Sequence, residues 1–87
     1  GEPLAIYPQV LKNVRVTDKT QAQNDADVRA MVERAAKELG TDGRILVRES
    51  GTEPLVRVMV EAGNVETCEK YVDAVIDVIR SKGYVIE

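Results

Sequence analysis

The chain has 87 residues, of which 44% are hydrophobic and 31% are charged, and its formal net charge is −3. This length allows one domain with a modest core, and the composition is typical of folded globular proteins rather than disordered or membrane-spanning ones. The acidic balance argues against general nucleic-acid binding, which needs a basic face. A single cysteine excludes an internal disulfide, and the absence of histidine excludes histidine-based catalysis or metal binding.

Residues 1–9 contain Pro3 and Pro8 and show no periodicity, which favours a linker from a missing preceding domain. Because the chain does not begin with methionine, we expect a piece of a longer protein, with the domain itself at 10–87. The lone thiol, the lack of a signal peptide and the lack of a long apolar run predict a cytoplasmic protein that does not enter a membrane.

The first predicted elements are a strand, a loop and a helix. Apolar alternation predicts a strand at 11–17, and the polar stretch 18–24 is expected to be a loop. Asn24 is the predicted N-cap of a helix that ends at Gly40. Its predicted apolar stripe is Val28, Val32, Ala35, Ala36 and Leu39, and its predicted i, i+4 ion pair is Glu33 with Lys37.

Two β-branched runs follow, at 44–48 and 55–61, and predict antiparallel strands joined by the loop 50–54. Residues 64–81 predict a second helix, capped by the asparagine at its start. Residues 84–87 are expected to form a short terminal strand or a frayed tail. The apolar stripe of the second helix is Val65, Cys68, Val72, Val75, Ile76 and Ile79, bordered by Tyr71.

This order of elements predicts an α+β domain, with an antiparallel sheet of three or four strands and two helices packed on one face. Val56, Val58 and Val60 are expected to face the core. Arg57 and Met59 are then left on the other face, for solvent or a neighbouring domain.

The loop between the two valine-rich strands carries groups that suit a phosphate ester. Ser50 and Thr52 can each donate a hydroxyl hydrogen bond, and Gly51 can let consecutive N–H groups converge on one point. Arg48 and Arg57 border the loop on either side, and arginine binds phosphate in two-point fashion. An ordinary hairpin turn, with each arginine in a surface salt bridge to Glu53 or Glu61, is the alternative interpretation.

From Arg48 to Glu61 the chain reads Arg-x-Ser-Gly-Thr-Glu-Pro-x-x-Arg-Val-Met-x-Glu, which resembles the phosphate-binding signature of the α-D-phosphohexomutases. That signature lies in their fourth, C-terminal domain. A second block, Tyr7 to Val16, is similar to the bacterial phosphoglucosamine mutase branch. The resemblance covers nearly the whole chain, from about Ala5 to Ser81.

The resemblance implies a TATA-box-binding-protein-like fold and a parent enzyme that interconverts glucosamine 6-phosphate and glucosamine 1-phosphate for amino-sugar nucleotides and peptidoglycan precursors. Such enzymes carry a phosphoserine and a Mg²⁺ site in their first three domains, so this chain is expected to hold no catalytic residue or metal site and to be inactive alone. Its implied partners are a phosphosugar and the other three domains, with no nucleic acid and no membrane. The implied phosphate-binding residues are Arg48, Glu49, Ser50, Gly51, Thr52 and Arg57, with Glu49 contributing only through its backbone.

The carboxylates of Glu49 and Glu53 would repel a bound phosphate, so both are expected to point away from it or to pair with an arginine. Relatives often carry a small residue or proline where this chain has Glu49. Cys68 lies on an apolar stripe, which predicts a buried, inert thiol. Three other interpretations stay open: the same domain of a phosphomannomutase/phosphoglucomutase, a small regulatory ligand-binding module, and a protein-interaction module that docks a partner beside Met59.

Overall fold

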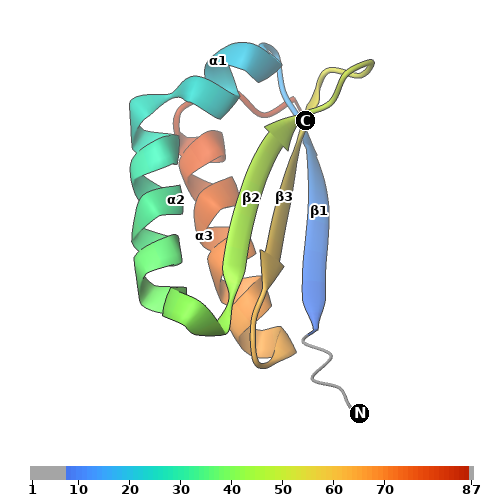
Figure 1. The fold of residues 1–87 in the computed structure, drawn as a ribbon. Helices are drawn as coiled ribbons and strands as arrows, with labels where there is room; N and C mark the ends of the chain where they lie inside the picture. Colours follow the sequence, from blue (N-terminus) through green and yellow to red (C-terminus); the bar gives the residue numbers. More distant parts are fainter. Residues whose placement is uncertain (1–7, 87) are drawn as a thin grey trace.

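The computed structural model describes residues 8–86, so the sequence-predicted linker at 1–9, apart from its last two residues, and Glu87 lie outside the described residues. Within residues 8–86 the chain forms one antiparallel sheet of three strands, three α-helices and a 3₁₀ turn. The helices cover one face of the sheet and leave the other uncovered (Figure 1). The α+β class is therefore confirmed. In chain order the elements are β1 (Gln9–Arg15), α1 (Lys19–Asn24), α2 (Ala26–Leu39), η1 (Gly40–Asp42), β2 (Arg44–Glu49), β3 (Leu55–Glu61) and α3 (Val65–Ser81).

The strand β3 lies at the centre of the sheet, in the order β1-β3-β2, and pairs antiparallel with both neighbours. Because side chains alternate along a strand, Val56, Val58 and Val60 face the helices and have no exposed surface. Arg57 and Met59 lie on the uncovered face, as predicted. The core between sheet and helices is built mostly from valine, whose branched side chain suits a pleated surface.

Residues 19–24 form the helix α1, so the prediction of a loop there was wrong. Asp18 caps this helix, because its carboxylate accepts a hydrogen bond from the Gln21 amide at 3.0 Å. Ala22 is completely buried and attaches the helix to the core. Six residues with one apolar side chain show no readable periodicity, and a helix this short depends on tertiary contacts.

The helix α2 begins one residue later than predicted. Asp25, not Asn24, is its N-cap, and the carboxylate accepts from the amides of Asp27 and Val28 at 2.8 and 3.3 Å. Asn24 instead ends α1, where its side-chain amide donates to the Thr20 carbonyl at 2.9 Å. A carboxylate is the stronger cap at this position, because its charge also suits the helix dipole.

The end of α2 and the start of α3 lie at the predicted residues, but the buried face of each helix differs from its predicted apolar stripe. Gly40 ends α2 with a φ of 61°, and Asn64 caps α3 by accepting from the Thr67 amide at 2.7 Å. Ala36 and Val65 were predicted to be buried, and both are exposed. Val65 is the first residue of α3, at the end of the helix, and its side chain is not covered by the sheet.

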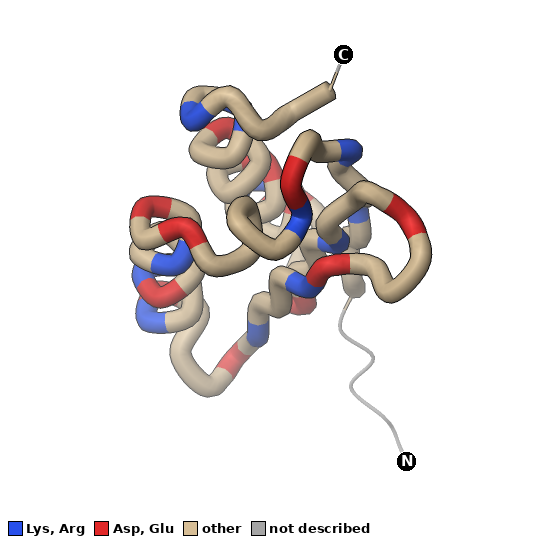
Figure 2. The backbone as a smooth tube through the Cα atoms, turned by 90° about the horizontal axis from the view of Figure 1, so that it is seen from above, with Lys and Arg blue, Asp and Glu red and all other residues tan. Residues whose placement is uncertain are grey.

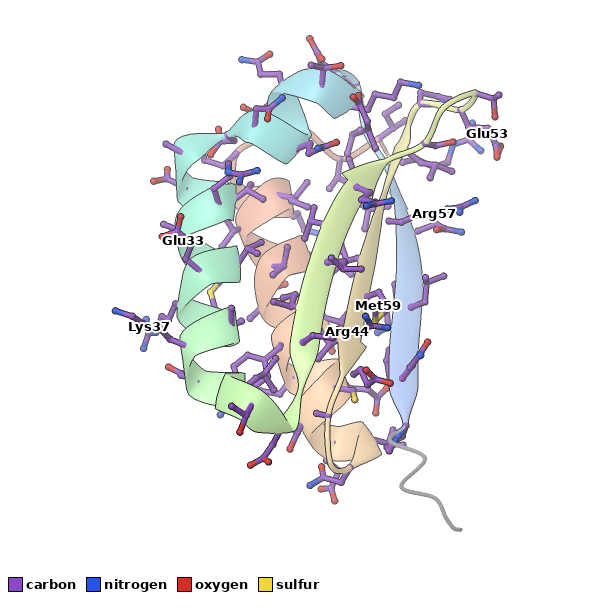
Figure 3. The ribbon with its side chains drawn as sticks, in the orientation of Figure 1. Glu33, Lys37, Arg44, Glu53, Arg57 and Met59 are labelled. Carbon is purple, nitrogen blue, oxygen red and sulfur yellow. The ribbon has the colours of Figure 1, made fainter. Side chains whose placement is uncertain are left out.

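The predicted ion pair between Glu33 and Lys37 does not form within residues 8–86. Figure 3 shows both side chains on the outer surface of α2, turned to solvent. Arg34 and Glu38, one position further along, form the i, i+4 pair at 3.3 Å. Glu38 also accepts a hydrogen bond from the Tyr71 hydroxyl at 2.6 Å, which fixes its carboxylate between α2 and α3.

The segment after α3 returns to the end of β1. Val85 forms a β-bridge with Val16, and the backbone of Tyr84 accepts from the Thr17 amide at 2.8 Å. The Tyr84 hydroxyl donates to Asp25 at 2.7 Å, and this bond lowers the pKa of Asp25 and raises the pKa of Tyr84. Residues 84–86 therefore pair with the segment that follows β1, through an isolated β-bridge and not as a regular strand.

Cys68 is completely buried, as predicted, and its thiol donates to the Pro8 carbonyl at 3.3 Å. None of the helices in residues 8–86 is long and apolar enough to cross a membrane.

Candidate functional site

The loop Ser50–Pro54 extends past the end of the sheet between β2 and β3 (Figure 1). Ser50 is its anchor: the side chain is buried, and its Oγ accepts from the amides of Thr52 and Glu53 at 3.3 and 3.2 Å. The Ser50 amide donates to the Leu55 carbonyl at 2.9 Å and closes the base of the loop. The amides of Thr52 and Glu53 therefore converge on the serine oxygen, and not on an open anion-binding point as expected. The serine hydroxyl proton has no acceptor among the described residues.

Arg48 and Arg57 are direct cross-strand partners, so both side chains leave the sheet on its uncovered face. Figure 3 shows Arg57 projecting from that side. Both arginines are exposed, and neither makes an ion pair with another residue of the 8–86 range. Glu61 pairs with Arg44 instead, at 3.0 Å, so the salt bridges of the alternative interpretation do not form in this structure. Two facing cations without an acid leave a local positive site.

A third arginine borders this region. Arg15 ends β1 opposite Leu55, two residue pairs nearer the loop than Arg57, and lies on the same uncovered face. It was not among the predicted site residues, because the alignment of β1 with β3 cannot be read from spacing. Its presence strengthens the positive charge where the loop leaves the sheet.

The two acidic side chains of the loop region lie away from the arginines. Glu49 alternates with Arg48 and so faces the helices, where its carboxylate accepts from the Thr20 hydroxyl at 2.8 Å. Its backbone amide donates to the Gln23 side chain at 2.7 Å. Glu53 lies at the exposed tip of the loop (Figure 3). Figure 2 looks down on this end of the molecule and shows positions of both signs around it.

The helix α1 supplies a cation that the sequence analysis missed. The ammonium of Lys19 donates to the Ser50 carbonyl at 2.5 Å, in a partly buried contact. Asp18 was a local signal for the helix itself, because its side chain caps α1, but a cap does not show that Lys19 lies beside the loop.

The remaining predicted residues are open to solvent. Gly51 and Thr52 are both exposed, and a Cβ built at Gly51 would meet no atom within 4 Å. The site thus combines hydroxyl and amide donors with a surplus of arginine, which suits binding of an oxyanion such as phosphate. Within residues 8–86 no group of three or more Cys, Asp or Glu side chains is placed to hold a metal ion.

The uncovered face continues from the arginines into an apolar row. Leu11, Met59 and Leu46 are paired across the three strands, one row further from the loop than Arg48 and Arg57. Leu11 is 56% exposed and Leu46 is 41% exposed, although both are apolar. A shallow hollow of about 230 Å³ on this face is lined by Gln9, Leu11, Arg44, Leu46, Arg48, Arg57 and Met59.

Comparison with known proteins finds relatives of this chain among phosphosugar mutases. Residues 11–78 match the family described as phosphoglucomutase/phosphomannomutase, C-terminal domain. The chain is 80% identical over 84 residues to a phosphoglucosamine mutase of Lachnospira eligens, covering 97% of this chain and 19% of that protein. A phosphoglucosamine mutase of Lachnoclostridium phytofermentans is 56% identical over 82 residues, covering 94% of this chain and 18% of that protein. The chain therefore spans about a fifth of the length of the curated relatives it matches.

Solved structures share the same architecture. An Aspergillus fumigatus N-acetylphosphoglucosamine mutase, solved with GlcNAc-6P and magnesium, superimposes with a TM-score of 0.73 at 23% identity over 91% of this chain and 16% of its own. A substrate complex of an N-acetylglucosamine-phosphate mutase of the α-D-phosphohexomutase superfamily gives a TM-score of 0.70 at 26% identity, covering 86% and 16%.

Proposed function

The chain belongs to the family of phosphoglucomutase/phosphomannomutase C-terminal domains, and we propose that it holds the phosphate of a phosphosugar within a phosphoglucosamine mutase. The parent enzyme would interconvert glucosamine 6-phosphate and glucosamine 1-phosphate in the cytoplasm, on the way to amino-sugar nucleotides and cell-wall precursors. The proposed phosphate-binding residues are Arg48, Glu49 through its backbone, Ser50, Gly51, Thr52 and Arg57.

The proposed role is to bind the phosphate that is not being transferred. A phosphate monoester carries about −1.5 to −2 charges at neutral pH. Each charge-assisted hydrogen bond contributes about 1.5–3 kcal/mol, and the proposed donors to the phosphate include Arg48, Arg57 and the Ser50 hydroxyl. That remote binding orients the other end of the sugar for reaction.

Catalysis itself would depend on the rest of the parent protein. The Mg²⁺ ion and the phosphoserine of such enzymes would lie in other domains. Bound Mg²⁺ would stabilise negative charge on the transferring phosphoryl group. We propose that the isolated chain is inactive and binds phosphosugar weakly, with a Kd of about a millimolar or higher, which corresponds to about −4 kcal/mol or less favourable.

The observation that carries this proposal is the facing pair Arg48 and Arg57, without an acidic partner in the described chain, beside a serine-anchored loop. Nuclear magnetic resonance titration of the labelled chain with glucosamine 6-phosphate tests it. Shifts of the amides of residues 50–52, with no response to phosphate-free glucosamine, are expected. Unchanged loop amides at saturating phosphosugar concentration would contradict the proposal.

A second candidate role uses the uncovered face for protein binding, and the exposed Leu11, Leu46 and Met59 row favours it. A regulatory ligand site has no comparable support in the described structure. Replacing Leu46 by serine separates the two roles. Protein docking through this face would be lost, whereas phosphosugar shifts at the loop would be retained.

A further inference from the structure

We propose that Lys19 is a positioning residue of the loop: it fixes the peptide between Ser50 and Gly51 so that the Gly51 N–H points away from α1 as a donor for the bound phosphate. The inference rests on the proposed function, which it deepens by assigning a donor and the residue that aims it.

The first step is the geometry of one peptide unit. The Lys19 ammonium donates to the Ser50 carbonyl oxygen at 2.5 Å and so holds that oxygen towards α1. None of the described peptide bonds is cis. In a planar trans peptide the carbonyl and the following N–H point in opposite directions. Holding the Ser50 oxygen on the α1 side therefore turns the Gly51 N–H to the opposite side.

The second step is that the Gly51 N–H remains free to donate to a ligand, whereas the neighbouring loop amides already have acceptors. The Ser50 amide is used by the Leu55 carbonyl, and the amides of Thr52 and Glu53 are used by the Ser50 hydroxyl. The Gly51 amide has no hydrogen-bond partner among residues 8–86. Space beside Gly51 is open, since a Cβ there would meet nothing within 4 Å. A ligand oxygen can reach this donor without displacing protein atoms.

The third step is electrostatic. A cation on the Ser50 carbonyl polarises the peptide and strengthens its N–H as a donor, because hydrogen bonds in one chain reinforce each other. The same contact occupies a carbonyl oxygen that would otherwise repel an anion, and it adds a positive charge next to the loop.

The fourth step is that Lys19 is itself held in place. The next turn of α1 binds the end of β2 through two side chains, because Thr20 donates to the Glu49 carboxylate and Gln23 accepts from the Glu49 amide. The Asp18 cap and the buried Ala22 fix α1 in turn. Lys19 thus extends from a helix that is itself fixed against β2 and the core. Its ammonium can therefore hold the Ser50–Gly51 peptide in one orientation.

The test is a titration of the 87-residue chain with glucosamine 6-phosphate, followed through the Gly51 amide. In the native sequence the Gly51 proton is expected to move downfield on saturation, as a new donor bond forms. Lys19→Met is expected to raise the Kd about fivefold, which corresponds to about 1 kcal/mol. The same variant is expected to reduce the Gly51 shift, because the peptide is no longer held in one orientation. Lys19→Arg keeps a cationic donor and is expected to restore most of both effects.

A matched control removes one positive charge elsewhere. Lys37 lies exposed on the far side of α2 (Figure 3), so Lys37→Met is expected to leave the Kd and the Gly51 shift unchanged. A Lys19→Met chain with native affinity and a native Gly51 shift would overturn the inference. If Lys19→Met unfolds, Lys19→Gln decides, because a neutral donor should give an intermediate Kd and an unchanged Kd would overturn the inference. No response of any loop amide in the native sequence would instead refute the proposed function.

Discussion

Arg48 and Arg57 face each other across β2 and β3, with both side chains on the uncovered side of the sheet. Like charges placed directly opposite on neighbouring strands destabilise a sheet by about 0.2–1 kcal/mol. Neither arginine finds an acidic partner in residues 8–86. The pair therefore costs the free fold some stability, and a bound anion would remove that cost.

Arg57→Gln is accordingly expected to raise the free energy of unfolding by up to about 0.5 kcal/mol, because it removes the repulsion. The same change should weaken glucosamine 6-phosphate binding about tenfold, through the loss of a charge-assisted bond. Urea unfolding and amide-shift titration measure the two effects. Arg29→Gln, on the exposed surface of α2, is the control and should change neither. A less stable Arg57→Gln chain with unchanged affinity would contradict this account.

Ser50 and Thr52 are predicted to differ in what they contribute to the fold. Ser50→Ala leaves the amides of Thr52 and Glu53 without their acceptor and should lower the free energy of unfolding by about 1–2 kcal/mol. Thr52→Ala, at an exposed position, should change it by less than about 0.5 kcal/mol. Both should weaken phosphosugar binding. Equal effects of the two changes on thermal unfolding would show that the serine anchor is not needed.

Two glycines give a second matched comparison. A Cβ at Gly43 would lie 2.4 Å from the Glu61 carbonyl oxygen, a backbone atom that cannot move aside, so Gly43→Ala should destabilise the fold by about 2 kcal/mol or more. Gly51→Ala meets no atom and should leave stability within about 1 kcal/mol. Denaturant midpoints of the two variants test this, and a Gly51→Ala chain as unstable as Gly43→Ala would contradict it.

The contact between Asp25 and Tyr84 predicts a specific pH dependence. The pKa of Asp25 is lowered from its usual 3.8, chiefly by the Tyr84 hydroxyl, so its stabilisation is present above 3.8 and is lost as pH falls through the lower folded pKa. The pKa of Tyr84 is raised above 10.0, chiefly by the bond to Asp25, so its stabilisation is present below 10.0 and is lost as pH rises through the higher folded pKa.

Tyr84→Phe removes this contact. The difference in unfolding free energy between the native chain and Tyr84→Phe should therefore be largest near neutral pH, and should shrink as the pH falls below 3.8 and as it rises above 10.0. Urea unfolding at neutral pH and on the acid and alkaline sides measures it. Asp25→Asn keeps a capping side chain without the titratable group, and should flatten the acid side. A difference that is constant with pH would refute the assignment.

The sequence predicted the sheet and the position of Arg57 on its uncovered face because both follow from one rule, the alternation of side chains along a strand. The direct pairing of Arg57 with Arg48 depends on the strand register, which was not predicted. Val56, Val58 and Val60 are buried, and Arg57 is not, for that reason. The loop chemistry could be read from residue types, and the opposite orientations of Arg48 and Glu49 follow from their adjacency.

What the sequence could not supply came from contacts between distant segments. The helix α1 was predicted as a loop, because its stability comes from the burial of Ala22 and not from its own pattern. The approach of Lys19 to Ser50 joins residues 31 positions apart and leaves no local signal. The hydrogen bond from the Tyr71 hydroxyl to Glu38, the partner of Arg34, comes from another helix and could not be read from local spacing.

The central position of β3 has a mechanical consequence for the loop. Backbone groups of β3 are hydrogen-bonded to a strand on either side, so their amides should exchange with solvent slowly, whereas β2 has one neighbouring strand in the described sheet and otherwise packs against α1 and α2. The two ends of the loop therefore differ in how their backbones are held. Arg57 lies on the strand whose amides should be the better protected, and Arg48 on the strand whose amides should be the less protected.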